Sequence, residues 1–367
     1  MQDIRIERWA HTLVHYCLYI KAGETVAIRA TPLAAPLVEA VYREVVRAGA
    51  YPLPLIDLDT LEEILIREGN ESQLAKINPV LSTTAEYVDA QLTISSKSNT
   101  KSMSNLDPAR LATRRQASLA TRTTLRKREQ AGKYRWSLTL YPTEAYAQDA
   151  EMSLSEFEEF VFDVCFLNDP DPVARWQDIS AQQQRFVDWL KGHQHVRIKG
   201  DGTDLQLSIK DRIFINSNGK RNFPSGEFFT GPLENSANGV ITFDIPASYE
   251  GHSIDGVRLV LREGKVVEAS ARQGQAFLDH MLELDAGARY LGEFAFGNNT
   301  RVTRGIKNTL FDEKIGGTVH LALGASYPET GGLNHSALHW DMVCDLRRSG
   351  EVWIDDTLFL KDGKILI

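Results

Sequence analysis

Cysteine is scarce in this sequence of 367 residues, which contains only Cys17, Cys165 and Cys344. An odd number of widely spaced cysteines without a C-x-x-C pair provides neither a disulfide framework nor a zinc ribbon. The first 23 residues also lack a long apolar run, because Asp, Glu, Arg and His interrupt them. They predict an amphipathic packing helix rather than a secretory signal or a membrane span. Together these absences favour a protein of the reducing cytoplasm.

Basic residues are fewer than acidic residues. The sequence has 41 Lys and Arg against 49 Asp and Glu, and its net charge of -8 argues against general affinity for nucleic acid. One stretch, residues 110–135, is nevertheless strongly basic, with Glu129 as its single acid. It could steer an anionic ligand, but the lack of aromatic residues before Tyr134 favours a solvated helix or a subunit contact.

Several common catalytic motifs are missing. There is no H-E-x-x-H, no G-x-S-x-G, no P-loop, and no G-x-G-x-x-G after a first strand. The usual signatures of zincins, serine hydrolases and nucleotide-binding proteins are therefore absent, and the function must be sought in less familiar residue patterns.

Strands and helices alternate in the first half of the chain. Apolar strand-like runs at 26–30, 51–57, 90–96 and 136–142 are separated by helical patterns, which predicts parallel β–α units. After about residue 195 the pattern changes to short alternating strands and hairpins with Glu-Gly or Asp-Gly turns. We expect a doubly wound α/β domain over 1–194 and a domain dominated by antiparallel sheet over 195–367.

Two carboxylates in the second half stand in unusual surroundings. Glu227 lies between Pro-Ser-Gly and Phe-Phe-Thr, and Glu293 lies in the apolar run LGEFAFG. A lone acid in such a place is usually solvated, or sits on an edge strand with apolar neighbours on the other face. An acid buried in these contexts would need a partner, and a metal ion would remove the cost of burying its charge.

Histidine and aspartate supply further potential ligands. His320 interrupts the apolar run TVHLALG, and Tyr327 follows seven residues later. A single histidine in such a run is more often a hydrogen-bonded core residue than a ligand. His339 and Asp341 would project from the same face of a strand, with Trp340 on the opposite face, so this H-x-D pair is the strongest local indication of a metal site.

The five groups Glu227, Glu293, His320, His339 and Asp341 suit zinc, cobalt or manganese. Two divalent cations, three carboxylates and one bridging hydroxide would form a neutral cluster, which partial burial can accept. Such a pair of metals can activate the bridging hydroxide and polarise a peptide carbonyl, while the Tyr327 phenol hydrogen-bonds the developing oxyanion. Glu227 or Glu293 could carry the proton to the leaving amine.

The chain resembles, over most of its length, the thermophilic-type metallo-aminopeptidase family, that of aminopeptidases T and S. Four segments of the second half are the specific motifs of this resemblance. They are NFPSGEFFTGP, LGEFAFG, HLALGASYP and NHSALHWDM. The resemblance implies that the same five residues bind two divalent metals and that Tyr327 assists catalysis. It also implies release of N-terminal amino acids from peptides, and a homodimer with enclosed active sites.

One segment departs from the family pattern. The loop between Tyr327 and His339, residues 328–338, is shorter than the corresponding loop of typical family members. We expect this loop to shape the active-site cavity. His335 in this loop either supports the metal ligands from outside the coordination sphere or is a solvated loop histidine. His252 and His280 are expected to be structural.

Two other functions compete with the hydrolase. His320, His339 and Asp341 alone would form the facial triad of a mononuclear Fe(II) ring-cleaving dioxygenase. Such an enzyme would not need both glutamates as ligands, so hydrolysis with two metals is favoured. The third possibility is a catalytically silent binding homologue that keeps the fold. Metal content separates the three: two ions of zinc, cobalt or manganese per chain, one iron, or none.

Overall fold

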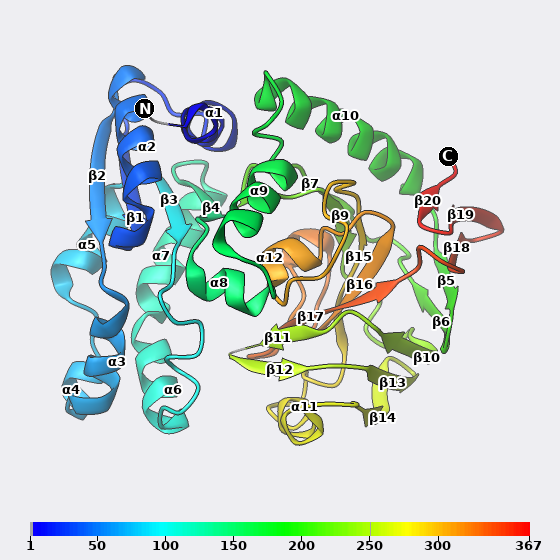
Figure 1. The fold of residues 1–367 in the computed structure, drawn as a ribbon. Helices are drawn as coiled ribbons and strands as arrows, with labels where there is room; N and C mark the ends of the chain where they lie inside the picture. The colour runs from blue at the N-terminus through cyan, green and yellow to red at the C-terminus, as the bar shows by residue number, and fades with distance from the viewer. Residues whose placement is uncertain (1–2, 250) are drawn as a thin grey trace. The chain divides into compact units, whose positions relative to one another are not determined.

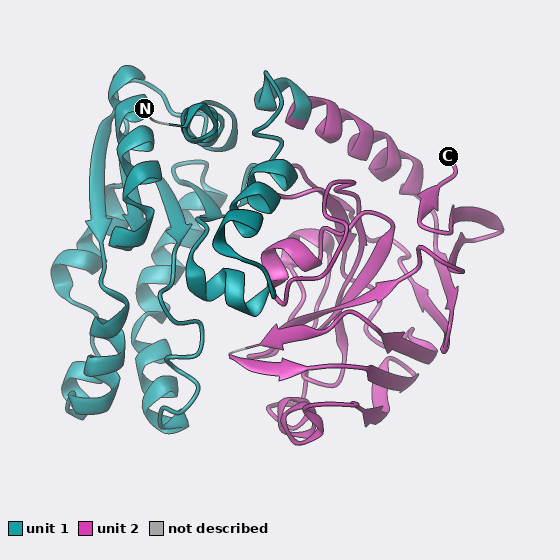
Figure 2. Ribbon diagram, viewed as in Figure 1, with its two compact units in different colours: residues 1–175, 219–223 teal, residues 176–218, 224–367 magenta. Residues whose placement is uncertain are grey.

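The computed structural model describes residues 3–249 and 251–367. It divides the chain into two compact units (Figure 2). Unit 1 is Met1–Arg175 with Gly219–Phe223, and unit 2 is Trp176–Asn218 with Pro224–Ile367. The division into domains at residue 194 stays a prediction.

Unit 1 contains a five-stranded parallel sheet in the order β2-β1-β3-β4-β8. Figure 1 labels the first four of these strands. Its strands are β1 (Thr25–Ala30), β2 (Tyr51–Ile56), β3 (Ala90–Ser95), β4 (Arg135–Leu140) and β8 (Asn222–Phe223). The chain starts at β1, adds β2 on one side, and then crosses to β3 on the other. This reversal is the winding of a doubly wound sheet.

The helical segments of unit 1 lie mainly between these strands in sequence, as parallel pairing requires. They are α1 (Ile4–His11), η1 (Thr12–Cys17), η2 (Pro32–Ala34), α2 (Ala35–Arg47), α3 (Asp59–Glu68), α4 (Glu71–Leu74), α5 (Pro79–Tyr87), α6 (Pro108–Ala117), α7 (Leu119–Gln130), α8 (Glu144–Asp149) and α9 (Leu154–Val164). Helix α10 (Pro172–Leu190) then leads into unit 2. None of the helices in the described residues is long and apolar enough to cross a membrane.

The basic stretch at 110–135 forms most of α6 and α7. Several of its arginines hydrogen-bond the ends of other helices. Arg110 donates to the carbonyls of Ile66 and Gly69 at the end of α3, and Arg128 donates to those of Ala85 and Val88 at the end of α5. Guanidinium groups are suitable donors for the free carbonyls of a helix C-terminus. These arginines therefore have a structural role.

Unit 2 is built from antiparallel strands. The larger sheet has the order β14-β13-β10-β6-β5-β18-β19-β20, a second has the order β17-β16-β15-β9-β7, and β11 pairs with β12. The strands are β5 (His195–Gly200), β6 (Thr203–Ser208), β7 (Ile215–Ser217), β9 (Glu227–Thr230), β10 (Asn238–Phe243), β11 (Ala247–Tyr249), β12 (His252–Ile254), β13 (Val257–Arg262), β14 (Lys265–Ser270), β15 (Leu291–Gly297), β16 (Thr318–Gly324), β17 (His339–Asp345), β18 (Glu351–Ile354), β19 (Thr357–Lys361) and β20 (Lys364–Ile365). Two short helices, α11 (Gln275–Leu282) and α12 (Thr309–Asp312), and the 3-10 turn η3 (Pro328–Thr330) connect them.

Aromatic side chains join the two larger sheets of unit 2. The rings of Phe228 on β9 and Phe296 on β15 stack with centroids 4.9 Å apart, and Phe296 lies 5.0 Å from Phe359 on β19. All three are fully buried, within one apolar core. One face of the β17-β16-β15-β9-β7 sheet is therefore fixed by hydrophobic packing.

The predicted fold class is confirmed: the first half is a parallel α/β layer and the second is mainly antiparallel. The structure differs in detail. Strand β7 has only three residues, Ile215–Ser217, and the N-terminal helix continues as a π-helix over Thr12–Cys17. The sequence analysis also did not identify β8, which returns the chain to the sheet of unit 1.

Candidate metal centre

The six predicted site residues lie in unit 2, on four neighbouring strands and the loop that follows one of them. Glu227 begins β9, Glu293 lies on β15, His320 on β16, and His339 and Asp341 on β17. In the register of this sheet, Glu293 and Asp341 both pair with Ala322, and His320 pairs with Ala295. Residues paired across antiparallel strands point to the same face. The register therefore places the five predicted ligands on one face.

Small residues leave room on that face. Ala295, Gly297, Ala322 and Gly324 occupy positions between or beside the polar side chains. The alternate residues, among them Phe294, Leu321 and Trp340, point into the apolar core. The period-2 alternation of the strands thus separates a core face from a polar face.

Glu227 is held by the backbone that precedes it. Gly226 has φ +107°, and a Cβ atom there would lie 2.8 Å from the Cβ of Asn299. Asn299 in turn donates to the Ser225 carbonyl, and Gln183 on α10 donates to the Glu227 carbonyl at 2.9 Å. The Ser-Gly dipeptide therefore allows a close backbone approach that aims the Glu227 side chain at the cluster.

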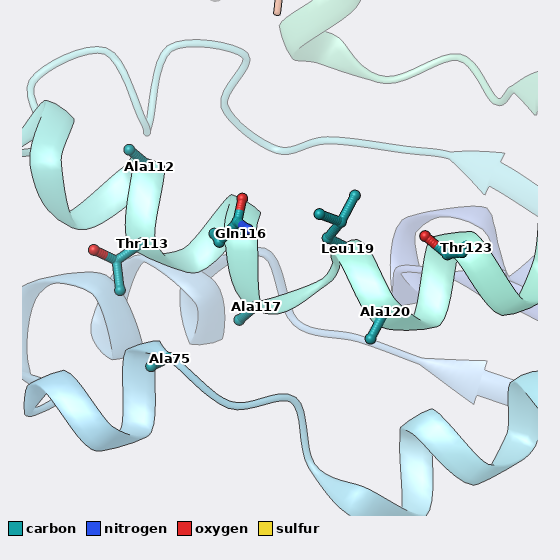
Figure 3. Close-up of a pocket in the computed structure, with 8 residues that line it drawn as sticks. All are labelled: Ala75, Ala112, Thr113, Gln116, Ala117, Leu119, Ala120 and Thr123. Carbon is teal, nitrogen blue, oxygen red and sulfur yellow. The ribbon is translucent and has the colours of Figure 1, made fainter.

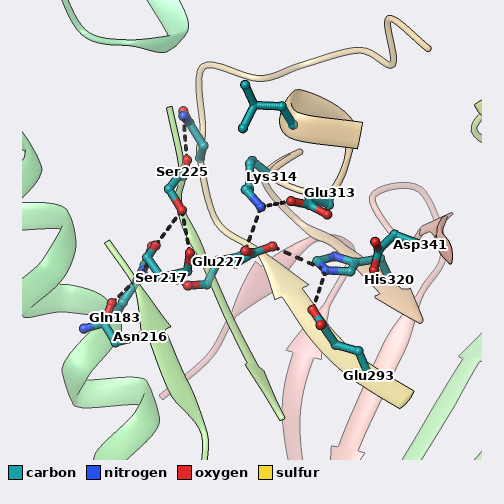
Figure 4. Close-up of polar contacts among 12 residues, drawn as sticks. Gln183, Asn216, Ser217, Ser225, Glu227, Glu293, Glu313, Lys314, His320 and Asp341 are labelled. Carbon is teal, nitrogen blue, oxygen red and sulfur yellow. Dashed lines mark hydrogen bonds and ion pairs between the residues drawn. The ribbon is translucent and has the colours of Figure 1, made fainter. Parts of the chain in front are cut away.

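Glu293 connects the two histidines. Its Oε1 lies 3.3 Å from His320 Nε2, and its Oε2 lies 3.6 Å from His339 Nε2. His320 Nε2 also lies 3.3 Å from Glu227 Oε2 (Figure 4). His339 Nε2 lies 3.5 Å from Asp341 Oδ2. Glu293 is only 4% exposed and β15 is an inner strand, so it is not the edge-strand acid that its local pattern also allowed. A β-bulge between Leu291 and Glu293 interrupts the pairing just before this side chain.

His339 and Tyr327 are neighbours in the cluster. His339 Nδ1 lies 2.8 Å from the Ala325 carbonyl. Donation to that carbonyl fixes the proton on Nδ1 and leaves Nε2 free as a ligand atom. The Tyr327 ring lies 5.1 Å from the His339 ring and 5.4 Å from that of Phe229. The phenol therefore belongs to the same site.

Two charged residues that the sequence analysis missed complete the cluster. Lys314 is fully buried, and its Nζ lies 2.6 Å from Glu227 Oε1 and in direct contact with Glu313 Oε1 (Figure 4). Ligand atoms of Glu313, His320 and Asp341 lie within 4.8 Å of one another. In the sequence these residues belong to the run Asp-Glu-Lys at 312–314, which is typical of a solvated turn, so no local signal distinguished them.

Burial raises the pKa of Glu227 to about 7, although the Lys314 ammonium opposes the shift. Burial and the Asp341 carboxylate raise the pKa of Glu293 well above its ordinary value. Burial alone would lower the pKa of His339, but the carboxylates of Asp341 and Glu293 outweigh it and raise that pKa. Without a metal ion, these groups therefore have more negative than positive charge among them.

A metal ion fits this arrangement. Glu227 Oε2, His320 Nδ1 and Asp341 Oδ1 are buried and have no hydrogen-bond partner among the described residues. Buried polar atoms of this kind call for a ligand or an ion. Imidazole nitrogen and carboxylate oxygen are donors that zinc, cobalt and manganese accept. Glu313 adds one negative charge and Lys314 one positive charge. The predicted net charge of zero for two divalent cations, three carboxylates and one hydroxide is therefore unchanged.

The remaining predicted features lie elsewhere. His335, His252 and His280 are exposed, which matches the solvated or structural alternatives for them. In unit 1, a hollow of about 940 Å³ is lined by the short side chains of α6 and α7 and their neighbours, such as Ala112, Ala120 and Thr123 (Figure 3). Its lining residues include no titratable group, so it offers no acid, base or metal ligand.

Comparison with known proteins identifies the family. Residues 2–356 match the family model described as thermophilic metalloprotease (M29). The chain belongs to this metalloprotease family. The metalloprotease is 29% identical to aminopeptidase 2 of Geobacillus stearothermophilus, over 98% of this chain and 95% of that one. It is 25% identical to aminopeptidase PepS of Streptococcus thermophilus, over 92% and 91%.

A solved structure shares the fold of the metalloprotease. Wild-type AmpT from Thermus thermophilus superposes with a TM-score of 0.86 over 99% of both chains, at 21% sequence identity. Family membership implies a divalent metal cofactor and hydrolysis of peptide bonds. It does not favour the iron dioxygenase or the silent binding homologue.

The glycine before Glu227 provides a test of how the site is positioned. Gly226→Ala should destabilise the protein and lower its metal content, because the new methyl group strains φ and collides with Asn299. Gly192→Ala is the matched control: it has φ +84° but nothing within 4 Å of the added Cβ. Backbone strain alone should cost about 1–2 kcal/mol. Equal metal content and equal unfolding midpoints in urea for the two variants would contradict this account.

The buried lysine provides a second test. Lys314→Met should lower the free energy of unfolding of the metal-free protein by about 3–5 kcal/mol, because Glu227 and Glu313 would lose their buried cation. The control is Lys361→Met, since Lys361 pairs with Glu351 in solvent and should matter little. Urea unfolding in the presence of a chelator measures both. Similar stability of the two variants would show that Lys314 does not neutralise the cluster.

Proposed function

We propose that this metalloprotease is a two-metal aminopeptidase, which releases the N-terminal residue of peptides. The observation that carries the proposal is the sharing of Glu293 between two groups of ligands. Glu227, Glu293 and His320 form one group, and Glu293, His339 and Asp341 form the other, each with ligand atoms within 4.8 Å. The relatives named aminopeptidase support exopeptidase action, since two of them match this chain over more than nine-tenths of their length.

The metal ligands of the proposal are Glu227, Glu293, His320, His339 and Asp341. One shared carboxylate and two histidines favour two ions of zinc, cobalt or manganese over a single iron. When bound, such ions would polarise the substrate carbonyl and make a nucleophile of water at neutral pH. The buried Lys314 would hold the Glu227 carboxylate in place on the side opposite His320.

Tyr327 and the carboxylates supply the remaining chemistry. Burial and the Glu293 and Asp341 carboxylates raise the pKa of Tyr327, so its phenol stays protonated and can donate to the oxyanion that develops on the scissile carbonyl. The leaving amine must gain a proton, which a neighbouring carboxylate can carry. Glu227 and Glu293 are the predicted carriers, and Glu313 is a further candidate because it adjoins His320 and Asp341.

The proposal extends to the assembly and location of the protein. A homodimer is expected from the family resemblance. A cytoplasmic location is supported by the small number and wide spacing of Cys17, Cys165 and Cys344, which are all buried. We further propose that residues 195–367 act as the catalytic domain.

Metal analysis combined with hydrolysis of aminoacyl reporter amides tests the proposal directly. We expect two metal ions per chain, and cleavage that N-terminal acetylation of the amide abolishes. Glu227→Gln should lose metal and lower kcat/KM about 100-fold or more, as judged from the effect of removing metal-site groups. Glu268→Gln, which removes an exposed carboxylate on β14, is the control and should change neither quantity.

Two results would overturn the proposal. A Glu227→Gln protein that stays fully metallated and fully active would exclude Glu227 as a ligand. One iron per chain without amide cleavage would instead return the assignment to an oxygenase that uses His320, His339 and Asp341.

Removal of the phenol tests the role of Tyr327 separately. Tyr327→Phe should lower kcat by about 10²- to 10³-fold, the usual effect of losing one oxyanion donor, while the metal content stays unchanged. Tyr290→Phe removes a phenol elsewhere in unit 2 and is the control. If Tyr327→Phe keeps most of the wild-type kcat, Tyr327 is only a packing residue beside His339.

A further inference from the structure

Unit 1 contains a second group of potential metal ligands, apart from the five on the sheet of unit 2. It consists of His11, the last residue of α1, His15 in η1, and Glu44 on α2. Ligand atoms of the three residues lie within 4.8 Å of one another. The family resemblance assigned no role to these residues, and the proposed peptidase reaction does not use them.

Both imidazoles converge on one carboxylate oxygen. His15 Nε2 lies 3.1 Å from Glu44 Oε2, and His11 Nδ1 lies 3.4 Å from the same atom. The two imidazole rings are neighbours, with centroids 4.4 Å apart. The other oxygen, Glu44 Oε1, accepts a 2.6 Å hydrogen bond from Arg47. Oε2 is therefore directed to the histidines while the carboxylate is held from its other side.

The helices explain why the three side chains meet. Residues four apart lie on the same face of a helix, so His11 and His15 project together. Their helix changes to a π-helix at Thr12, between the two histidines, and such segments are frequent at functional sites. Neighbouring residues Trp9, Ala10, Leu13 and Val14 are fully buried, which fixes the helix against the rest of unit 1. The cluster is thus built on rigid elements rather than on a loop.

The distances suit a small transition-metal ion. Bonds of about 2.0–2.1 Å from zinc to nitrogen or oxygen place tetrahedral ligand atoms roughly 3.3 Å apart. The two measured separations, 3.1 Å and 3.4 Å, are already close to that value. Two neutral imidazoles and one carboxylate are donors that Zn²⁺, Ni²⁺ and Cu²⁺ prefer.

We propose that His11, His15 and Glu44 form a second transition-metal site, distinct from the peptidase centre. The His11 side chain is 57% exposed, so an ion can reach the site from solvent and water can complete its coordination. Arg47 is 65% exposed, and its solvated charge leaves Glu44 Oε2 free to bind the ion. The ion would join the N-terminal helix to α2 and stabilise this part of unit 1.

Zinc binding to the full chain tests the site. Protein stripped with a chelator is dialysed against Zn²⁺, and bound zinc is counted by mass spectrometry. The wild type should hold one more zinc per chain than the double variant His11→Gln/His15→Gln. His280→Gln, which removes one exposed histidine on α11, is the control for weak surface binding and should retain the wild-type count.

Two further readouts separate a metal site from a simple contact between helices. Saturating zinc should raise the unfolding temperature of the wild type more than that of the double variant, and the double variant should retain amide hydrolysis. Glu44→Gln should bind this zinc about tenfold more weakly or worse. Equal zinc counts in the wild type and the double variant, or the same loss in His280→Gln, would overturn the proposal, whatever the outcome for the peptidase centre.

Discussion

The cost of burying charge governs this structure. Four carboxylates, two imidazoles and one ammonium group lie on or beside one face of a sheet, where water cannot solvate most of them. A buried carboxylate without a counter-charge takes up a proton instead of staying ionised. Lys314 supplies one positive charge from within the protein, and the remaining excess of negative charge would make the proposed site a receptor for divalent cations. Stability of the fold and affinity for metal are therefore linked through the same residues.

Hydrophobic packing on the opposite face of that sheet offsets the energetic cost of this arrangement. Phe228, Phe294 and Phe296 alternate with the polar positions on β9 and β15 and pack against the larger sheet. A one-residue slip of either strand would exchange the two faces, placing phenylalanine among the ligands and glutamate in the core. The hydrophobic packing thus sets the register of the strands, and the register sets the ligand geometry. The β-bulge before Glu293 is tolerated because it falls at the end of the paired segment.

Much of this could be predicted from the sequence because the relevant signals are local. The parallel and antiparallel halves followed from the alternation of apolar runs, and the His339–Asp341 pair from the two-residue period of a strand. Glu313 and Lys314 could not be predicted, because adjacent charged residues indicate solvent unless the fold buries them. Strand β8 was missed for a similar reason: Asn222 and Phe223 have no periodicity of their own, and only pairing with β4 makes them a strand. These features depend on contacts between residues far apart in the sequence, and such contacts cannot be read from the local pattern of one sequence.

The path of the chain through β8 has a consequence for how the protein is made. On the ribosome, the sheet of unit 1 emerges without its last strand, and β4 stays an open edge until Asn222 and Phe223 have been synthesised. Contacts between residues so distant in sequence are slow to form, because a long loop must close first. Glu227 follows only a few residues after this strand. The first of the proposed metal ligands is therefore produced just as the sheet of unit 1 can be completed. Neither unit can be excised as one continuous piece of chain.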